Sequence, residues 1–323
     1  MEKDSGKIIF LNPVCTHNIW GGSKLREEFG CDEAGDDLGE CWGISAYPGG
    51  DGTVSSGPYR GMHLSELWAD HRELFGGVSN LHDDKDEFPL LVKILDARED
   101  LSIQVHPNDD FASANEQHAL GKTECWYILD CPEDAKLVLG HNATSTMQLS
   151  EFIDEGKWNE LIREVTVKKG DFIQINPGTV HAIKAGFVIL ETQQSSNVTY
   201  RLYDYDRLQN GVKRQLHIDK CKQVITTPSP AARECILDAE TLTGEANSLE
   251  VMYAGMYYQV FKMQVLGEAF FEQKYKFLNV TVTDGAGKVD GIPVRKGKSF
   301  ILPHEYGVVH LEGEMEFIAS SVR

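Results

Sequence analysis

The sequence predicts a mainly β protein, a sandwich or a barrel with few helices. Short runs rich in β-branched and other apolar residues recur along the chain, and glycine and proline residues separate them. Many short strands divided by turn residues are typical of sandwiches and barrels. The expected strands, in chain order, are residues 7–11, 89–95, 125–129, 135–140, 171–175 and 187–190.

Helices are expected in three places. Apolar residues within 64–75 follow a helical spacing, and Gly76 after them can end a helix in the left-handed region. Residues 109–120 are polar and helix-like. Residues 146–164 predict one or two amphipathic helices that break near Gly156.

Two segments share one pattern, which indicates an internal duplication. Residues 168–177 and 295–303 each contain a basic pair, a glycine, a short strand and a proline, and each follows another predicted strand. Chance recurrence of this pattern in a β protein is the alternative. Only the first copy continues to a histidine, His181, in the matching place. We therefore expect the chemistry in the first copy and a structural role for the second.

The length of 323 residues favours two domains. Residues 226–233 are rich in proline and small residues, a composition typical of a connection between packed units. We expect residues 1–232 to form a catalytic domain with the helices inserted, and residues 233–323 to form a non-catalytic β domain.

Composition narrows the class of partner and the compartment. With 31 Lys and Arg against 50 Asp and Glu, the net charge is −19, and no basic cluster suits a nucleic acid backbone. We find no signal-like N-terminus and no apolar stretch of about 18 residues, so a cytoplasmic protein without a membrane partner is expected. Seven cysteines without a CxxC pair are typical of buried thiols rather than of a disulfide framework.

One short strand carries the first candidate ligands. Side chains alternate along a strand, so Ser102, Gln104 and His106 share one face while Ile103 and Val105 share the other. A solvated strand face is the simpler interpretation of such a polar row. A polar row opposite aliphatic side chains also describes a sheet whose inner face is a site.

Two further residues complete a candidate metal site with His106 and Gln104. Glu124 opens an apolar strand, and a Pro-Gly turn places His181 at the start of another. Alone, they would be an edge carboxylate and a turn histidine. Together, two imidazoles, one carboxylate and one amide oxygen suit a borderline divalent ion such as Zn²⁺ and leave positions for water or substrate. A single carboxylate leaves the ion with net positive charge, as a Lewis acid needs.

Seven motifs stand in an order that resembles a known family. They are Ile19-Trp-Gly-Gly22, Gly39-Glu-Cys-Trp42, Pro89-Leu-Leu-Val-Lys-Ile-Leu-Asp-Ala97, Ser102-Ile-Gln-Val-His-Pro107, Gly121-Lys-Thr-Glu124, Pro177-Gly-Thr-Val-His-Ala182 and Asn197-Val-Thr-Tyr-Arg201. The chain resembles type I mannose-6-phosphate isomerases of the short bacterial form, which are zinc enzymes of the cupin superfamily. The resemblance covers about residues 7–210 in motifs and implies a double cupin, an RmlC-like jelly roll, with a small helical insertion.

The resemblance also implies the cofactor and the reaction. One zinc ion per chain would be bound by His106, Glu124 and His181, with Gln104 or a water molecule as the fourth ligand. The enzyme would interconvert D-mannose 6-phosphate and D-fructose 6-phosphate through an enediol, with Arg201 as the catalytic arginine beside the open-chain sugar.

Four more positions carry roles by resemblance. Ser102 and Lys122 match positions associated with substrate, and Glu191 matches a carboxylate proposed for acid and base work. Arg207 lies where some members bind the phosphate with a cation, although residues 203–206 differ there from the longer enzymes.

The reaction itself restricts these roles. Loss of a proton from carbon needs a base whose pKa is brought towards neutrality, and both Glu191 and Lys122 remain candidates. Arg201 stays protonated, so it acts as a fixed charge; its simpler interpretation is a surface salt bridge with Asp204 or Asp206.

Because the chain is acidic, a phosphorylated sugar needs a local cationic pocket. Lys122, Arg201 and Arg207 could supply it, with Lys93 or Lys184. Lys93 lies within an apolar strand, where a carboxylate partner such as Glu40 or Asp96 is expected.

Two other functions remain open from the sequence. One is a cupin metalloenzyme of another type, an Fe²⁺-dependent oxygenase or phosphoglucose isomerase, and the other is a non-catalytic sugar-phosphate sensor. We expect a monomer or a weak homodimer, with the small phosphorylated sugar as its partner.

Overall fold

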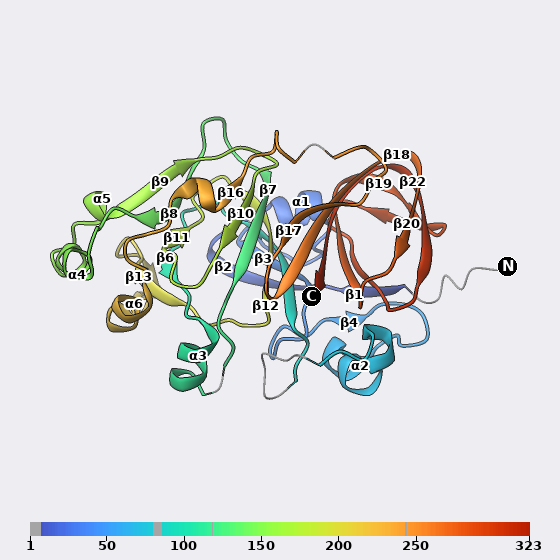
Figure 1. The fold of residues 1–323 in the computed structure, drawn as a ribbon, viewed down its shortest axis with the longest axis horizontal. Coiled ribbons are helices and arrows are strands. Elements are labelled where there is room, and N and C mark those ends of the chain that lie inside the picture. The colour runs from blue at the N-terminus through green and yellow to red at the C-terminus, as the bar shows by residue number, and fades with distance from the viewer. Residues whose placement is uncertain (1–7, 80–85, 118, 243) are drawn as a thin grey trace. The chain divides into compact units, whose positions relative to one another are not determined.

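A computed structural model describes residues 8–79, 86–117, 119–242 and 244–323 (Figure 1). It is mainly β, as the sequence predicts. The described residues group into two compact units: unit 1 contains those within 8–17, 23–94 and 242–323, and unit 2 those within 18–22 and 95–241. A single cut at residue 232 does not reproduce this grouping, because β1 (Ile9–Asn12) pairs with β21 (Ser299–Leu302). The expected two-domain division stays a prediction.

Unit 1 is built on one antiparallel sheet. Within the described residues its strand order is β17-β18-β22-β19-β21-β1-β4, and β20 pairs with β19. The remaining strands of this sheet are β4 (Thr53–Val54), β17 (Glu250–Ala254), β18 (Tyr258–Gln273), β19 (Leu278–Val289), β20 (Ile292–Arg295) and β22 (Gly307–Val322). Alternating residues of β18, β19 and β22, such as Met263, Val280 and Phe317, form its apolar core.

Other elements of this part of the chain precede or flank the sheet. They are β2 (Val14–Gly22), β3 (Leu38–Ile44), β5 (Leu90–Asp96), α1 (Lys24–Phe29), α2 (Leu64–Asp70) and the 3₁₀ helix η2 (Arg72–Phe75). The helix expected in 64–75 is therefore confirmed as α2 and η2, and Gly76 ends it with φ 70°. The strand expected at 7–11 corresponds to β1, with Lys7 outside the described residues.

Unit 2 contains two rows of strands with an apolar core between them. One row runs β16-β10-β7-β12 and the other β13-β6-β11-β8-β9. Their bounds are β6 (Ile103–Val105), β7 (Glu124–Asp130), β8 (Lys136–His141), β9 (Ile162–Thr166), β10 (Phe172–Ile175), β11 (His181–Ala182), β12 (Val188–Gln194), β13 (Tyr200–Tyr203) and β16 (Ile236–Leu237), with a separate hairpin of β14 (Leu208–Gln209) and β15 (Val212–Lys213). Ile128 and Ile173 from the first row share one core cluster with Leu137 and Leu139 from the second.

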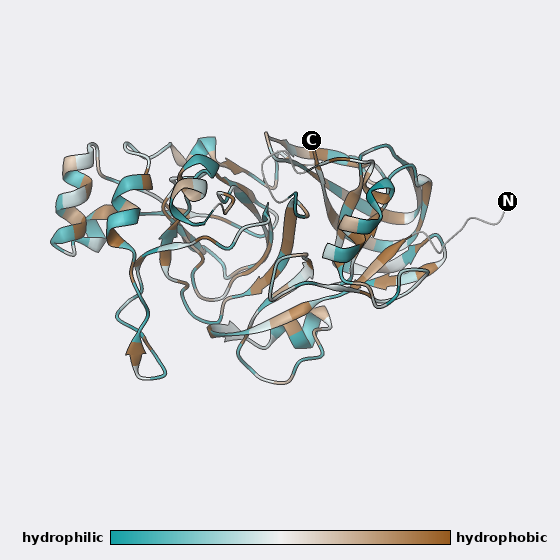
Figure 2. Ribbon diagram, turned by 90° about the horizontal axis from the view of Figure 1, so that it is seen from below, coloured by the Kyte–Doolittle hydropathy of each residue, from teal (hydrophilic) through white to brown (hydrophobic). Residues whose placement is uncertain are grey.

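Helices cover the other face of the second row. The helices α4 (Thr146–Asp154), α5 (Trp158–Leu161) and α6 (Ile218–Val224) lie at one end of unit 2, beside β8, β9 and β13 (Figure 1). Helix α4 carries both hydrophilic and hydrophobic residues (Figure 2), and its Leu149 packs in one cluster with Ile103 and Val105 of β6. Ile103 and Val105 therefore point towards the helices, which leaves the opposite face of β6 for Gln104.

The remaining helix predictions hold in part. Gly156, with φ 65°, separates α4 from α5 as expected, but residues 162–164 belong to strand β9. Helix α3 (Asp109–Asn115) is shorter than the predicted 109–120, and residue 118 lies outside the described residues. Among the helices that the structure describes, none is long and apolar enough to cross a membrane.

The two segments with a shared sequence pattern occupy equivalent places in their sheets. Strand β10 follows the first glycine and pairs with β7, while β21 follows the second and pairs with β19. A later strand of each unit pairs with the other side of the same partner: β12, the second strand after β10, pairs with β7, and β22, the strand directly after β21, pairs with β19. The same antiparallel arrangement around one central strand supports the expected duplication.

A cluster of aromatic rings in unit 1 generates a stability prediction. Phe277 is fully buried, and its ring centroid lies 5.4 Å from those of Phe75 and Phe88. We expect Phe277→Ala to lower the free energy of unfolding by about 3–5 kcal/mol, because it removes buried contacts and leaves a cavity. Chemical denaturation measures this loss. Phe270→Ala, at a residue 58% exposed, is the matched control and should cost less than about 1 kcal/mol; equal losses would contradict the prediction.

Candidate active site

Paired strands bring the expected ligands together in unit 2. His181 in β11 lies directly opposite Gln104 in β6, and Glu124 is the first residue of β7. The side chains of His106, Glu124 and His181 are at most 1% exposed. All nine residues expected at the site lie in unit 2.

Two glycines allow the chain to approach closely at these positions. Gly178 has φ 83°, and a Cβ there would lie 2.3 Å from Thr226 Oγ1 and 2.8 Å from a backbone carbonyl oxygen. A Cβ at Gly121 would lie 2.4–2.8 Å from backbone atoms of residues 107–109. Without that Cβ, Lys122 N–H donates to the Pro107 carbonyl at 3.0 Å, which sets the direction of the chain just before Glu124.

Three potential ligand atoms converge on one point. The Nε2 atoms of His106 and His181 are 3.2 Å apart, and they lie 3.5 and 3.3 Å from the two carboxylate oxygens of Glu124. Ligands about 2.0–2.1 Å from a tetrahedral metal ion are separated by about 3.3 Å. The observed separations therefore match those of atoms that share one ion.

The hydrogen bonds of the two imidazoles support the same conclusion. His106 Nδ1 lies 2.8 Å from the Val198 carbonyl, and His181 Nδ1 lies 2.8 Å from the Thr179 carbonyl. Each Nδ1 must donate to its carbonyl, so each Nε2 presents a lone pair. This carbonyl support of the second ring nitrogen is usual for histidines that bind a metal. Two lone pairs and a carboxylate that face one another can share one bound cation.

Burial and charge keep the three groups in their ligand forms. Burial first, and then the charge of the Lys122 ammonium, lower the pKa of His106 to about 3. Burial likewise lowers the pKa of His181. Burial alone would raise the pKa of Glu124, but Lys122 and the two histidines outweigh it and hold this pKa well below its ordinary value. Neutral imidazoles and an ionised carboxylate are the forms that bind a metal.

Gln104 is placed as a fourth donor. Its side-chain amide nitrogen lies 3.4 Å from His181 Nε2. The oxygen and nitrogen of an amide occupy nearly the same volume, so rotation of the amide by 180° places the oxygen at this position. The complete set of two imidazoles, one carboxylate and one amide oxygen suits Zn²⁺ and other borderline divalent ions.

Lys122 lies between two carboxylates. Its ammonium contacts Glu124 Oε2, lies 3.3 Å from His106 Nε2 and lies 3.7 Å from Glu191 Oε1. Glu191 is 3% exposed and accepts a hydrogen bond of 3.1 Å from the indole N–H of Trp126. The two candidates for the base are therefore neighbours of each other and of the metal ligands.

Arg201 lies beside the ligand strand. It is opposite Gln104 in the pairing of β13 with β6, and its Nε donates to Ser102 Oγ at 3.3 Å. Burial lowers the pKa of Arg201, and the charge of Arg214 lowers it further. Within the described part of the chain, Arg201 forms no ion pair with Asp204 or Asp206, which instead pair with other cations.

The other expected cations have carboxylate partners. Arg207 Nη2 lies 2.6 Å from Asp204, and Lys184 lies 2.6 Å from Glu164. Lys93 lies in unit 1, 3.2 Å from Glu40, so the expected pairing with that carboxylate is confirmed.

Sequence reasoning missed three contributors. Trp126 donates to Glu191, and its ring centroid lies 5.5 Å from that of His181. Its position two residues after Glu124, on the same face of β7, was a usable signal. Arg214 pairs with Asp204, and His217 accepts a hydrogen bond from the backbone N–H of Arg201. No local pattern marks these two, because both follow the exposed hairpin β14–β15.

Comparisons with known proteins were made with this geometry in hand. Residues 8–134 match the family model for the catalytic domain of type I phosphomannose isomerase, and residues 249–322 match that for the cupin domain of mannose-6-phosphate isomerase. The chain is 44% identical over 317 residues to mannose-6-phosphate isomerase ManA of Bacillus subtilis, covering 97% of this chain and 98% of that protein. It is 41% identical over 318 residues to mannose-6-phosphate isomerase of Streptococcus mutans, covering 97% of each.

A solved structure agrees with these relatives. The crystal structure of mannose 6-phosphate isomerase from Bacillus subtilis superposes with a TM-score of 0.87 at 43% identity, covering 97% of this chain and 99% of that chain. Together, the matches confirm the predicted mainly β cupin fold.

The depressed pKa of His106 predicts how the metal-free protein responds to acid. Below pH 6.5 the unfolded chain binds a proton at this residue, whereas the folded chain does not until about pH 3. As the pH falls from 6.5 to about 3, this residue should therefore lower the free energy of unfolding by up to about 1.4 kcal/mol per pH unit. Urea unfolding at several pH values measures the slope. His106→Gln should have a smaller slope, and identical slopes for the two proteins would contradict the assignment.

Proposed function

Because this chain belongs to the type I phosphomannose isomerase family, we propose that it interconverts D-mannose 6-phosphate and D-fructose 6-phosphate with one Zn²⁺ per chain. His106, Glu124 and His181 would bind the ion, with Gln104 or water as the fourth ligand. One observation carries the metal site: two imidazole lone pairs and a carboxylate, all buried, face one another at 3.2–3.5 Å.

The donor set supports zinc as the metal. It contains nitrogen and oxygen donors and no thiolate, and a single carboxylate leaves the bound ion positively charged. A bound Zn²⁺ would supply Lewis-acid stabilisation of the negative charge that develops on the sugar oxygens.

The proton transfer is assigned to Lys122 and Glu191 as a pair. The reaction removes a proton from C2 of the open-chain aldose, forms an enediol, and adds a proton at C1 while the carbonyl moves from C1 to C2. Lys122 Nζ and Glu191 Oε1 are 3.7 Å apart and buried, so both candidate bases lie at one place beside the metal ligands. Their burial also excludes water from the base, which favours proton transfer.

Arg201 is proposed as the fixed positive charge beside the enediol. Its guanidinium cannot give up its proton at physiological pH, so it stabilises negative charge without entering the proton transfer. The hydrogen bond from its Nε to Ser102 and that from its Nη1 to the Gln215 carbonyl at 2.9 Å orient it. Ser102 would thereby act on substrate binding both directly and by orienting Arg201.

A cluster of arginines supports phosphate binding near Arg201. Asp204 pairs with both Arg207 and Arg214, so one carboxylate faces two guanidinium groups. With Arg201 nearby, the cluster keeps a net positive charge within a chain of net charge −19. Such a local field attracts a phosphorylated sugar despite the acidic surface.

The compartment and the oligomeric state stay predictions: a cytoplasmic protein that is a monomer or a weak homodimer.

Loss of a histidine ligand tests the metal site. We expect His106→Ala or His181→Ala to lose the bound zinc and to lower kcat for mannose 6-phosphate by at least about 100-fold. Mass spectrometry of the metal and a coupled isomerase assay measure both effects. His310→Ala, a histidine of unit 1, is the control and should retain both. Full turnover by a metal-free ligand variant would refute the proposal, and iron with no turnover of mannose 6-phosphate would favour the iron-enzyme alternative.

Arg201→Ala separates electrostatic stabilisation from metal binding. We expect zinc to stay bound while kcat falls by about 10²–10³, the usual effect of removing one preorganised donor from a developing negative charge. Arg201→Lys should restore part of kcat because it keeps the charge but not the hydrogen-bond geometry. Arg233→Ala, at an exposed arginine of unit 2, is the control. An unchanged kcat in Arg201→Ala would remove this residue from the mechanism.

A further inference from the structure

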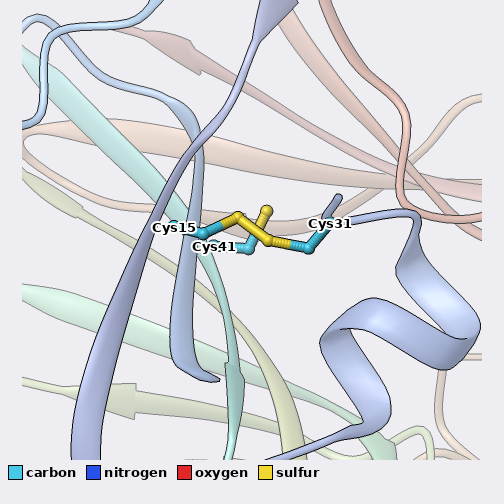
Figure 3. Close-up of side chains that lie close together, drawn as sticks. All are labelled: Cys15, Cys31 and Cys41. Carbon is cyan, nitrogen blue, oxygen red and sulfur yellow. A yellow bond between two sulfur atoms is a disulfide. The ribbon is translucent and has the colours of Figure 1, made fainter. Parts of the chain in front are cut away.

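Three cysteines of unit 1 converge on one point, apart from the site described above. Cys15 lies on β2, Cys31 lies in the turn after α1, and Cys41 lies on β3. Their sulfur atoms all lie within 4.8 Å of one another. The structure joins Cys15 and Cys31 as a disulfide, with the Cys41 side chain beside that bond (Figure 3). The expectation that all seven cysteines are thiols is therefore wrong for this pair.

The local fold brings the turn that carries Cys31 to strands β2 and β3. Strands β2 and β3 are neighbours in their sheet. Helix α1 buries Leu25 and Phe29 and ends at Gly30, which has φ 69°. The next N–H, of Cys31, donates to the Leu25 carbonyl at 3.1 Å, so the chain turns back and directs Cys31 towards the strands.

A disulfide accounts for only two of these sulfurs. Cys31 is 1% exposed and Cys41 is 2% exposed, whereas Cys15 is partly exposed. Buried cysteines elsewhere donate to backbone carbonyls, as Cys125 does to Thr192 and Cys221 to Tyr200. Within the described residues Cys41 has no such hydrogen bond, and the other two sulfurs lie within 4.8 Å of its own.

We propose that the reduced protein binds a second Zn²⁺ through the thiolates of Cys15, Cys31 and Cys41. Sulfur atoms about 2.3 Å from a shared zinc ion lie about 3.8 Å apart, within the limit observed for this cluster. The Cα atoms of Cys15 and Cys31 are 6.8 Å apart, at the wide end of the range for disulfides, and an ion between two sulfurs accommodates such a separation. Three soft donors select zinc or another thiophilic metal.

The site differs in chemistry from the His/Glu/His site. A dithiol reductant supplies two electrons and two protons: it is oxidised to its own disulfide, while the bond between Cys15 and Cys31 is reduced to two thiols. The ion then displaces three thiol protons, and water from the partly exposed side at Cys15 completes four-coordination. Burial raises the pKa of Cys41 to about 12, so a bound cation is what would stabilise its thiolate. The bound ion would tie β2, β3 and the turn after α1 together.

Cobalt substitution tests the proposal. Metal-free protein, kept reduced with a dithiol, is titrated with Co²⁺ alone. We expect two equivalents per chain and a thiolate-to-cobalt charge-transfer band, which nitrogen and oxygen ligands do not produce. His106→Ala should lose one equivalent and keep the band, so failure of this site and failure of the proposed active site are distinguishable.

Cysteine variants identify which residues produce the charge-transfer band. Cys15→Ser, at a partly exposed position, and Cys41→Ala should each lose the band and one equivalent of cobalt while keeping isomerase activity. Cys131→Ser, outside the cluster, is the matched control and should keep both equivalents. If Cys41→Ala fails to fold, the spectra of Cys15→Ser and of the wild-type protein still test whether the cysteines bind the metal. A reduced wild-type protein that binds one equivalent of cobalt and shows no charge-transfer band would overturn the proposal.

Discussion

The convergence of two buried imidazole lone pairs on a buried carboxylate is the constraint that the rest of unit 2 serves. Acceptors that face one another in a protein interior are costly unless donors or cations satisfy them. The Lys122 ammonium meets part of this need at Glu124 Oε2 and His106 Nε2, and a bound metal ion would meet the rest. The carbonyls of Val198 and Thr179 orient the rings, and the pairing of β6 with β11 sets their separation. The close approaches at Gly121 and Gly178 set the chain directions that lead to Glu124 and His181. Each of these features is explained by the requirement to hold three ligand atoms 3.2–3.5 Å apart.

Charge is arranged around this centre against the overall balance of the chain. The protein carries a net charge of −19, yet Lys122, Arg201, Arg207 and Arg214 all lie in unit 2, the unit that holds the candidate metal ligands. Asp204 orients two of these arginines without neutralising both. Burial is the main cause of the low pKa of His106, and the Lys122 ammonium adds to it while also lowering the pKa of Glu124, so one lysine supports the ligand forms of two residues. Local organisation of charge therefore matters more for an anionic substrate than net charge does.

Features that depend on residues close together in the sequence could be predicted, whereas contacts between residues far apart in the sequence could not. The six expected strands all overlap observed strands, and the helix ending at Gly76 was recognisable because apolar spacing and a glycine end signal act within a few residues. The ligand types were recognisable from their chemistry and, as a set, from the family resemblance. Arg214 and His217 were missed, because their contacts with Asp204 and Arg201 arise only when the chain returns after a hairpin. The cysteine cluster was missed for the same reason, since its members lie on three separate segments.

By itself the sequence determined the mainly β class, the alternation that puts Gln104 and His106 opposite the aliphatic face of β6, and the list of residues able to bind a metal or carry charge. Tertiary structure decided which of them meet. It grouped the N-terminal strand β1 with the C-terminal sheet, left Arg201 apart from the acidic residues close to it in sequence, and brought three sulfurs together. The physical reason is that side-chain periodicity is a local property of the backbone, whereas the distance between two side chains from different strands depends on pairing and packing of the whole unit.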